Sequence, residues 1–178
     1  MDEERKEEIL EKLEKASSEN YETSWDEKGL PISKSKEKIK VGKKSKKSGA
    51  DFELQVRKNL EGMGWTLAKW SNNVDLEIKK VVSAKKGMVF NPFFKRMMPT
   101  LSSTGFPDFI AFQLTGERAY NIIGVECKVN GILSKEEKEK CVFLINNKIF
   151  NEIWAAQKNE DTKKIEYINF RERFEKLF

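Results

Sequence analysis

The segment Pro107-Asp108-Phe109-Ile110-Ala111-Phe112 decides the fold, together with Glu126-Cys127-Lys128 further along the chain. Asp108 opens an apolar run, and Glu126 ends a second, largely apolar run over residues 120–125. Two such runs, separated by a short turn at Gly116, predict adjacent strands. Two carboxylates and one lysine then lie at the ends of neighbouring strands. These are the residue types that metal-assisted cleavage of a phosphodiester requires.

Alternation along the second strand sets the direction of its last side chains. Glu126 and Lys128 share one face, whereas Val125 and Cys127 point to the other face and into the core. Pro107, which has a fixed φ and no N–H, suits the start of the first strand. Two plainer interpretations stay open. Glu126 and Lys128 can be a surface ion pair worth ~0–1 kcal/mol, and Pro-Asp can be simple turn chemistry.

A third carboxylate comes from a predicted helix over residues 50–62, which Gly62 and Gly64 can end. Its apolar stripe consists of Phe52, Val56, Leu60 and Met63. Glu53 lies at the border of this stripe and can lean toward the sheet, while Leu54 faces solvent. The alternative is a surface glutamate stabilised by the helix dipole.

The remaining patterns predict an α/β fold, with a central mixed β-sheet flanked by helices. Ser134 and Glu137 form a capping box at the start of a helix over 134–147. A long loop occupies residues 83–106. Predicted strands cover residues 65–70, 74–82, 107–114, 119–128, 149–157 and 165–170, the last at an edge, and a short helix covers 171–178.

The N-terminal part differs in charge and composition, so we expect two regions, a charged extension over 1–47 and a domain over 48–178. Residues 1–32 hold 11 acidic and 5 basic residues. We expect a helix over 3–16 and then irregular chain over 17–32, with Gly29-Leu30-Pro31 as a breaker. Residues 33–47 hold 8 lysines and 1 acidic residue. This composition predicts a mobile linker. A basic segment suits a polyanionic partner, although lysine-rich tails are often only solubilising.

Composition narrows the class of protein. At 178 residues the chain can form one domain with a substantial core. Its 35 % charged residues and mean hydropathy of -0.66 predict a soluble protein with no membrane partner. The N-terminal residues lack the profile of a secretion signal, which predicts a cytoplasmic location. The sequence contains no histidine, so any metal is held by oxygen, which favours Mg²⁺, with Mn²⁺ able to substitute.

The ordered set of helical Glu53, Pro107-Asp108, and Glu126-x-Lys128 resembles the PD-(D/E)xK nuclease superfamily over roughly residues 45–157. The run from Lys47 to Glu53, and Leu60-Glu61-Gly62-Met63-Gly64-Trp65 after it, are similar to the opening of archaeal Holliday-junction resolvases and small archaeal-virus nucleases. The resemblance implies a restriction-endonuclease-like core and a metal-dependent DNA endonuclease, with the structure-specific activity of a resolvase.

The resemblance also implies a role for each site residue. Asp108 and Glu126 bind Mg²⁺ with the backbone carbonyl of Cys127, and Glu53 binds the metal directly or through water. Lys128 orients or helps to deprotonate the attacking water. Resolvases cut two strands symmetrically, so a homodimer is expected. The long loop and the first 47 residues depart from the family pattern, which leaves the type of DNA substrate open.

Basic residues outside this constellation are candidates for binding DNA. Those in the loop lie among phenylalanines, which suits phosphate contact and base stacking, although the loop can equally be a lid or a dimer contact. The candidates are Lys43, Lys44, Lys46, Lys47, Lys85, Lys86, Lys95 and Arg96. Alternative functions are a non-catalytic nucleic-acid-binding module, a nuclease for plain duplex or single strands, and an interaction protein with residues 1–16 as its arm.

Overall fold

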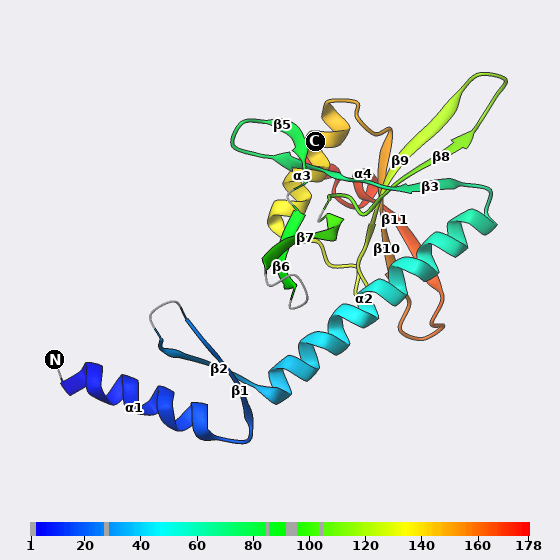
Figure 1. Cartoon of the computed structure of the whole chain (residues 1–178). Helices are drawn as coiled ribbons and strands as arrows, with labels where there is room; N and C mark the ends of the chain where they lie inside the picture. The colour runs from blue at the N-terminus through cyan, green and yellow to red at the C-terminus, as the bar shows by residue number, and fades with distance from the viewer. Residues whose placement is uncertain (1–2, 27–28, 85, 92–95, 104) are drawn as a thin grey trace. The chain divides into compact units, whose positions relative to one another are not determined.

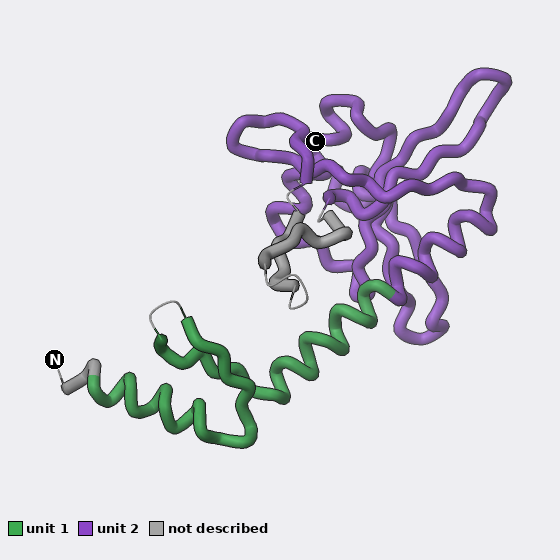
Figure 2. The backbone as a smooth tube through the Cα atoms, in the orientation of Figure 1, with its two compact units in different colours: residues 1–50 green, residues 51–178 purple. Residues whose placement is uncertain are grey.

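The computed structural model of the chain describes residues 3–26, 29–84, 86–91, 96–103 and 105–178. The chain divides into two compact units, residues 1–50 and residues 51–178, which Figure 2 shows in different colours. The division lies inside the long helix α2 (Lys36–Gly62), whereas the sequence placed it after residue 47.

The first unit contains more regular structure than the sequence indicated. Helix α1 (Glu3–Ser17) is present as predicted. Strands β1 (Tyr21–Trp25) and β2 (Pro31–Ser35) form an antiparallel hairpin, so the prediction of irregular chain over 17–32 is wrong. Gly29, at φ 75°, lies in the turn between them. Of the residues interpreted as a breaker, Gly29 and Leu30 belong to the hairpin connection, and Pro31 begins β2.

The lysine-rich segment is also regular, because β2 continues directly into α2 at Lys36. The prediction of a linker over 33–47 is therefore wrong. Lysine is a good helix former, so a run of lysines does not by itself prevent a helix. The end of α2 at Gly62 agrees with the predicted helix end, whereas its start lies well before residue 50.

The second unit is built on a five-stranded mixed sheet with the order β11-β10-β9-β8-β3 (Figure 1). Strands β9 and β10 are parallel, joined through helix α3 (Lys135–Asn146), and the other neighbours are antiparallel. The predicted mixed sheet with helices, and β11 at its edge, are confirmed. The strands are β3 (Thr66–Lys69), β8 (Phe109–Leu114), β9 (Tyr120–Cys127), β10 (Glu152–Lys158) and β11 (Ile165–Asn169).

Helices α2 and α3 cover opposite faces of this sheet, because successive strand residues point to opposite sides. The α2 face is packed by Phe52, Val56 and Leu60 against Phe109, Ala111, Ile123 and Val125. The α3 face is packed by Cys141, Leu144 and Ile145 together with Phe150, Ile153 and Ala155. Met63, predicted on the buried stripe, is 52 % exposed, since α2 has already ended at Gly62.

Two hairpins form two-stranded sheets that are separate from the main sheet. Strands β4 (Asn72–Asp75) and β5 (Lys80–Ser83) replace the single extended segment predicted over 74–82. Strands β6 (Lys86–Asn91) and β7 (Arg96–Ser103) pair within the predicted long loop, so that prediction is wrong. Lys86 and Arg96 begin these two strands, whereas Lys85 and Lys95 lie outside the described residues.

The chain ends in helix α4 (Phe170–Arg173) and a 3-10 turn, η1 (Glu175–Leu177), where a single short helix was predicted. Phe170 is buried and stacks near Phe174, which anchors this end on the α3 side of the core. Within the described part of the chain, no helix is both long and apolar enough to cross a bilayer.

Candidate active site

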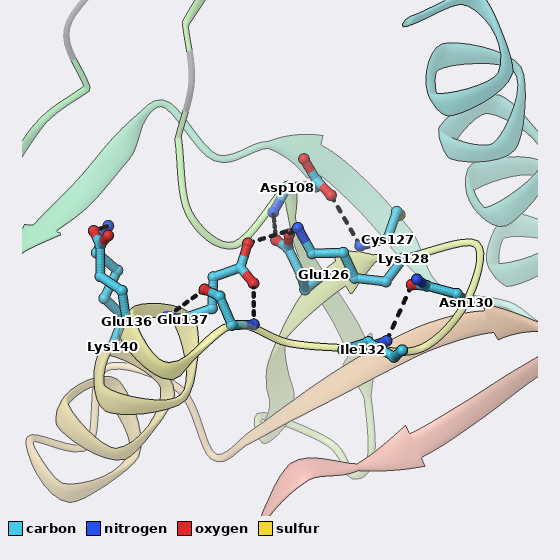
Figure 3. A network of polar contacts seen from close by, with 10 residues as sticks. Asp108, Glu126, Cys127, Lys128, Asn130, Ile132, Glu136, Glu137 and Lys140 are labelled. Atoms are coloured by element: carbon cyan, nitrogen blue, oxygen red, sulfur yellow. Dashed lines mark hydrogen bonds and ion pairs between the residues drawn. The ribbon is translucent and has the colours of Figure 1, made fainter. Parts of the chain in front are cut away.

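Strand pairing brings Asp108 and Glu126 together. Strands β8 and β9 are antiparallel with Phe109 opposite Val125, so Asp108, just before β8, lies beside the last residues of β9. The two acidic residues exchange bonds with the opposite backbone. Glu126 Oε2 accepts from the Asp108 N–H at 3.2 Å, and Asp108 Oδ2 accepts from the Cys127 N–H at 2.9 Å (Figure 3). These reciprocal bonds fix both carboxylates at the strand ends.

Burial makes this pair of like charges costly. Glu126 is 5 % exposed, and Asp108 is partly buried. Burial raises the pKa of Asp108; the Cys127 N–H opposes this rise and the charge of Glu53 adds to it. Burial and the negative charge of Asp108 raise the pKa of Glu126 to about 8, although Lys128 opposes that rise. A cation bound here would compensate the negative charge of the two carboxylates.

Lys128 follows β9 on the same face as Glu126, as the alternation predicts. Its Nζ lies 3.1 Å from Glu126 Oε1 and 2.6 Å from Glu137 Oε1. Burial disfavours the charged lysine, but the bond to Glu137 and the charge of Glu126 outweigh this effect and raise the pKa of Lys128 to about 12. The side chain is therefore protonated at neutral pH and acts as a donor.

The main contact of Glu53 is a lysine side chain, whereas the sequence predicted a metal ion. Glu53 is half-buried on α2, at the border of the apolar stripe, and Leu54 faces solvent as expected. The Glu53 carboxylate forms an ion pair with Lys69, the last residue of β3. The Lys69 Nζ also lies 4.5 Å from the centre of the Phe109 ring. Glu53 and Lys69 are close enough to Asp108 for both charges to act on its pKa.

Cys127 turns its side chain to the α2 face of the sheet, as predicted, where it packs against the core. Burial and the charge of Asp108 raise the pKa of the Cys127 thiol, so the thiol stays neutral. Its backbone N–H is bonded to Asp108, which keeps the backbone of residue 127 beside the two carboxylates. The role of its carbonyl as a metal ligand stays a prediction.

Close approach at Gly124 holds the start of β8 in place. A Cβ at Gly124 would lie 2.7 Å from Cγ of Pro107 and 3.3 Å from Cδ2 of Phe150. Pro107 is buried and immediately precedes Asp108. The absence of a side chain at Gly124 therefore lets Pro107 pack over β9, and this contact sets the position at which Asp108 enters the sheet.

Two residues of the constellation were missed by sequence reasoning. Glu137 was identified as the third helix residue of a capping box, but nothing in its spacing links it to Lys128. Lys69 belongs to no sequence motif that would mark it as a site residue. Its position follows only from strand pairing, since β3 and β8 place Lys69 opposite Phe109, the residue after Asp108. Both contacts depend on tertiary structure that no local pattern encodes.

The predicted DNA-binding lysines of the N-terminal region, Lys43, Lys44, Lys46 and Lys47, are all exposed on α2 within the first unit. They keep their place as candidates for phosphate contact.

No protein-family model, curated protein or solved structure matches the chain significantly. Among the residues that the structure describes, no group of three or more Asp, Glu or Cys side chains is arranged to hold a metal ion. The described acidic residues that do lie together are Asp108 and Glu126, with Lys128 beside them.

Proposed function

We propose that the chain is a metal-dependent DNA endonuclease of the PD-(D/E)xK type, with a restriction-endonuclease-like core. One observation supports this most strongly. Asp108 and Glu126 meet at the ends of two paired strands, tied by reciprocal backbone bonds, with the Lys128 ammonium 3.1 Å from Glu126. The fold thus brings together two carboxylates and one ammonium group from residues far apart in sequence. Burial of such groups is unfavourable, and a purely structural role does not require it.

The donor set suits a hard divalent cation. Mg²⁺ is commonly held by one or two carboxylates completed by water and substrate phosphate, rather than by a full protein cage. Asp108 and Glu126 would hold it, with the Cys127 carbonyl and Glu53 as further candidate ligands. When bound, Mg²⁺ or Mn²⁺ would lower the pKa of a coordinated water and stabilise the charge that develops on the phosphate.

Lys128 would orient the nucleophile rather than deprotonate it. An ammonium has three donor positions, and the contacts to Glu126 and Glu137 use two of them. A pKa of about 12 keeps the third proton in place at neutral pH. That donor is then available to a water molecule or a phosphate oxygen at the site.

The substrate class follows from charge and from the resemblance. Exposed lysines on α2 suit a DNA backbone, and a resolvase-like, structure-specific activity on Holliday junctions is the form we propose, carried out by a homodimer. Size-exclusion chromatography with light scattering measures the oligomeric state. Because the β6–β7 hairpin occupies the predicted loop, its basic residues Lys86 and Arg96 enter this proposal as strand residues.

A cleavage panel tests the proposal. Four-way junction, flap, duplex and single-stranded DNA are each incubated with the protein, in Mg²⁺ and in chelator. Cleavage that requires the metal and disappears in both Asp108→Asn and Glu126→Gln supports it, provided both variants still bind DNA and melt cooperatively. Cleavage retained in both purified variants would exclude this site.

A non-catalytic nucleic-acid-binding module is the second candidate. It is favoured by the ion pair between Glu53 and Lys69, which occupies the third predicted metal ligand. Such a module binds DNA in the same panel but cuts none of the four substrates in Mg²⁺ or Mn²⁺.

A further inference from the structure

Helix α3 begins at the candidate site, and one side chain belongs to both. Ser134 is the N-cap of α3, and its hydroxyl accepts from the Glu137 N–H at 3.2 Å. In return, Glu137 Oε2 accepts from the Ser134 N–H at 2.7 Å. This is a complete capping box. It satisfies backbone donors at the helix end and holds the Glu137 carboxylate in one orientation.

The other oxygen of the same carboxylate faces the site. Glu137 Oε1 lies 2.6 Å from the Lys128 Nζ, shorter than the 3.1 Å between Lys128 and Glu126 (Figure 3). The two side chains are 22 % and 28 % exposed, so neither lies free in solvent. A capping box needs only the oxygen bonded to Ser134. The second contact is therefore additional to what the helix end requires.

We propose that Glu137 is a positioning residue, which holds the Lys128 ammonium in place beside Glu126 for the reaction. This inference rests on the proposed nuclease function and extends it to a residue outside the PD-(D/E)xK pattern. A lysine side chain is long and has many rotamers. Glu126 alone would leave it free to pivot, whereas two carboxylates on different elements, β9 and α3, restrict it to one position.

The alternative role is capping alone, and two variants separate the roles. Ser134→Ala removes the hydroxyl of the capping box but keeps the Ser134 N–H that anchors Glu137, and it leaves the contact to Lys128 intact. Glu137→Ala removes both the capping contact with Ser134 and the contact with Lys128. Glu136→Gln is the charge control, because Glu136 is an exposed acid in the same helix turn, paired with Lys140 rather than with the site.

The experiment measures two quantities on all four proteins. The rate of Lys128 acetylation by acetic anhydride, read by mass spectrometry, reports whether the ammonium is held. Single-substrate kinetics on the cleaved DNA give kcat and KM. Circular dichroism and a melting curve establish that each variant is folded.

We expect Glu137→Ala to raise the Lys128 acetylation rate severalfold and to lower kcat about 10–100-fold, as loss of a supporting contact typically does. KM should change little, because the DNA-binding lysines are untouched. Ser134→Ala and Glu136→Gln should keep both the acetylation rate and kcat, even where Ser134→Ala lowers the melting temperature.

Two results would overturn the positioning role while leaving the nuclease intact. One is an unchanged Lys128 acetylation rate and kcat in Glu137→Ala, and the other is an equal loss of kcat in Ser134→Ala. A wild-type protein that cleaves none of the DNA substrates overturns the proposed function itself, and with it any effect of Glu137 on the reaction. The acetylation rates still show in that case whether Glu137 holds the lysine.

Discussion

Asp108 has an energetic conflict with its surroundings. It lies partly buried beside buried Glu126, and burial and the negative charge of Glu53 oppose its ionisation. The Cys127 N–H compensates only part of this cost. Sites of this kind hold like charges together at the expense of stability, which is usual where a cation or substrate supplies the missing charge.

Asp108→Asn should therefore stabilise the protein while it removes cleavage. The asparagine oxygen still accepts from the Cys127 N–H, but the cost of burying a carboxylate charge near Glu53 is gone. A gain on the order of 1 kcal/mol raises Tm by about 2–4 °C in a chain of this size. Melting curves with and without chelator measure it, and Asp51→Asn, an exposed position on α2, is the control. A lower Tm for Asp108→Asn would contradict the expectation.

The same effect has a defined pH dependence. The pKa of Asp108 in the folded chain is raised above the ordinary 3.8, so between these values the folded state retains a proton that the unfolded state has lost. The contribution of Asp108 to stability is therefore full below about pH 4 and is lost as pH rises to the pKa of Asp108 in the folded chain. The Tm advantage of Asp108→Asn should grow over that interval and vanish below it. An advantage that is constant with pH would point to packing instead of charge.

Lys69 competes for the carboxylate that the metal would use. It is 55 % exposed, pairs with Glu53, and lies near the Phe109 ring, beside Asp108. A metal that engaged Glu53 would release the Lys69 ammonium, which could then contact a DNA phosphate. Substitution of Lys69 should then change the affinities for metal and for DNA in opposite directions.

Lys69→Met should tighten Mn²⁺ binding and weaken DNA binding. An exposed ion pair contributes about 0–1 kcal/mol, so each affinity should change by about fivefold at most. Calorimetry with Mn²⁺ and fluorescence anisotropy with a DNA duplex measure the two affinities. Lys58→Met on the exposed surface of α2 is the control. Changes of both affinities in the same direction would show that Lys69 does not compete for Glu53.

The hairpin of β8 and β9 positions the site through its backbone as much as through its side chains. Gly124 leaves room for Pro107, and Pro107 sets the start of β8 at Asp108. Gly116, in the turn of the same hairpin, has no such contact, since a Cβ there meets only the Ala119 Cβ at 4.0 Å. Gly116 is therefore a matched control for Gly124 in a test of whether the contact with Pro107 determines the position of Asp108.

Gly124→Ala should lower both stability and cleavage. The added methyl forces the Pro107 ring away, which costs about 1–3 kcal/mol as overpacking and moves Asp108 from the Cys127 N–H. Melting curves and hydrogen exchange at the Cys127 amide measure the two effects. Gly116→Ala should leave both nearly unchanged. Full protection of the Cys127 amide in Gly124→Ala would mean that Pro107 does not determine the position of Asp108.

Elements with strong local patterns could be predicted from the sequence. The apolar runs of β8 and β9, the stripe Phe52, Val56 and Leu60, and the capping box at Ser134 are each encoded within a few residues, and all are confirmed. The strands β1, β2, β6 and β7 were missed. Strands β2, β6 and β7 contain Pro or Gly, and β1 has only five residues. Hairpin pairing rather than periodicity therefore makes these segments strands.

The candidate site divides in the same way. Glu126 and Lys128 share a face because strand geometry has a period of two, and their proximity to Asp108 followed from one short connection. The partners of Glu53 and Lys128 could not be inferred. Lys69 and Glu137 reach the site from β3 and α3, and only the completed sheet order brings those elements to the same strand ends.

Charge is distributed unevenly over the whole chain. Residues 1–32 are acidic, whereas residues 33–47, on β2 and the first part of α2, hold 8 lysines and 1 acidic residue. The lysines proposed to bind DNA are exposed on a helix, not carried on a linker. A helix spaces its charges regularly, so several ammonium groups can meet a phosphate backbone without first ordering a flexible chain.

Replacement of Lys43, Lys44, Lys46 and Lys47 by glutamine should weaken DNA binding and reduce its dependence on salt. Each lost phosphate contact lowers the slope of log K against log salt by about 0.9 on duplex DNA. Anisotropy titrations over a range of KCl concentrations measure that slope. The matched control replaces four exposed lysines of the second unit, Lys148, Lys163, Lys164 and Lys176, and removes the same charge. Equal reductions in the two quadruple variants would show that binding depends on net charge alone, and that α2 is not the contact surface.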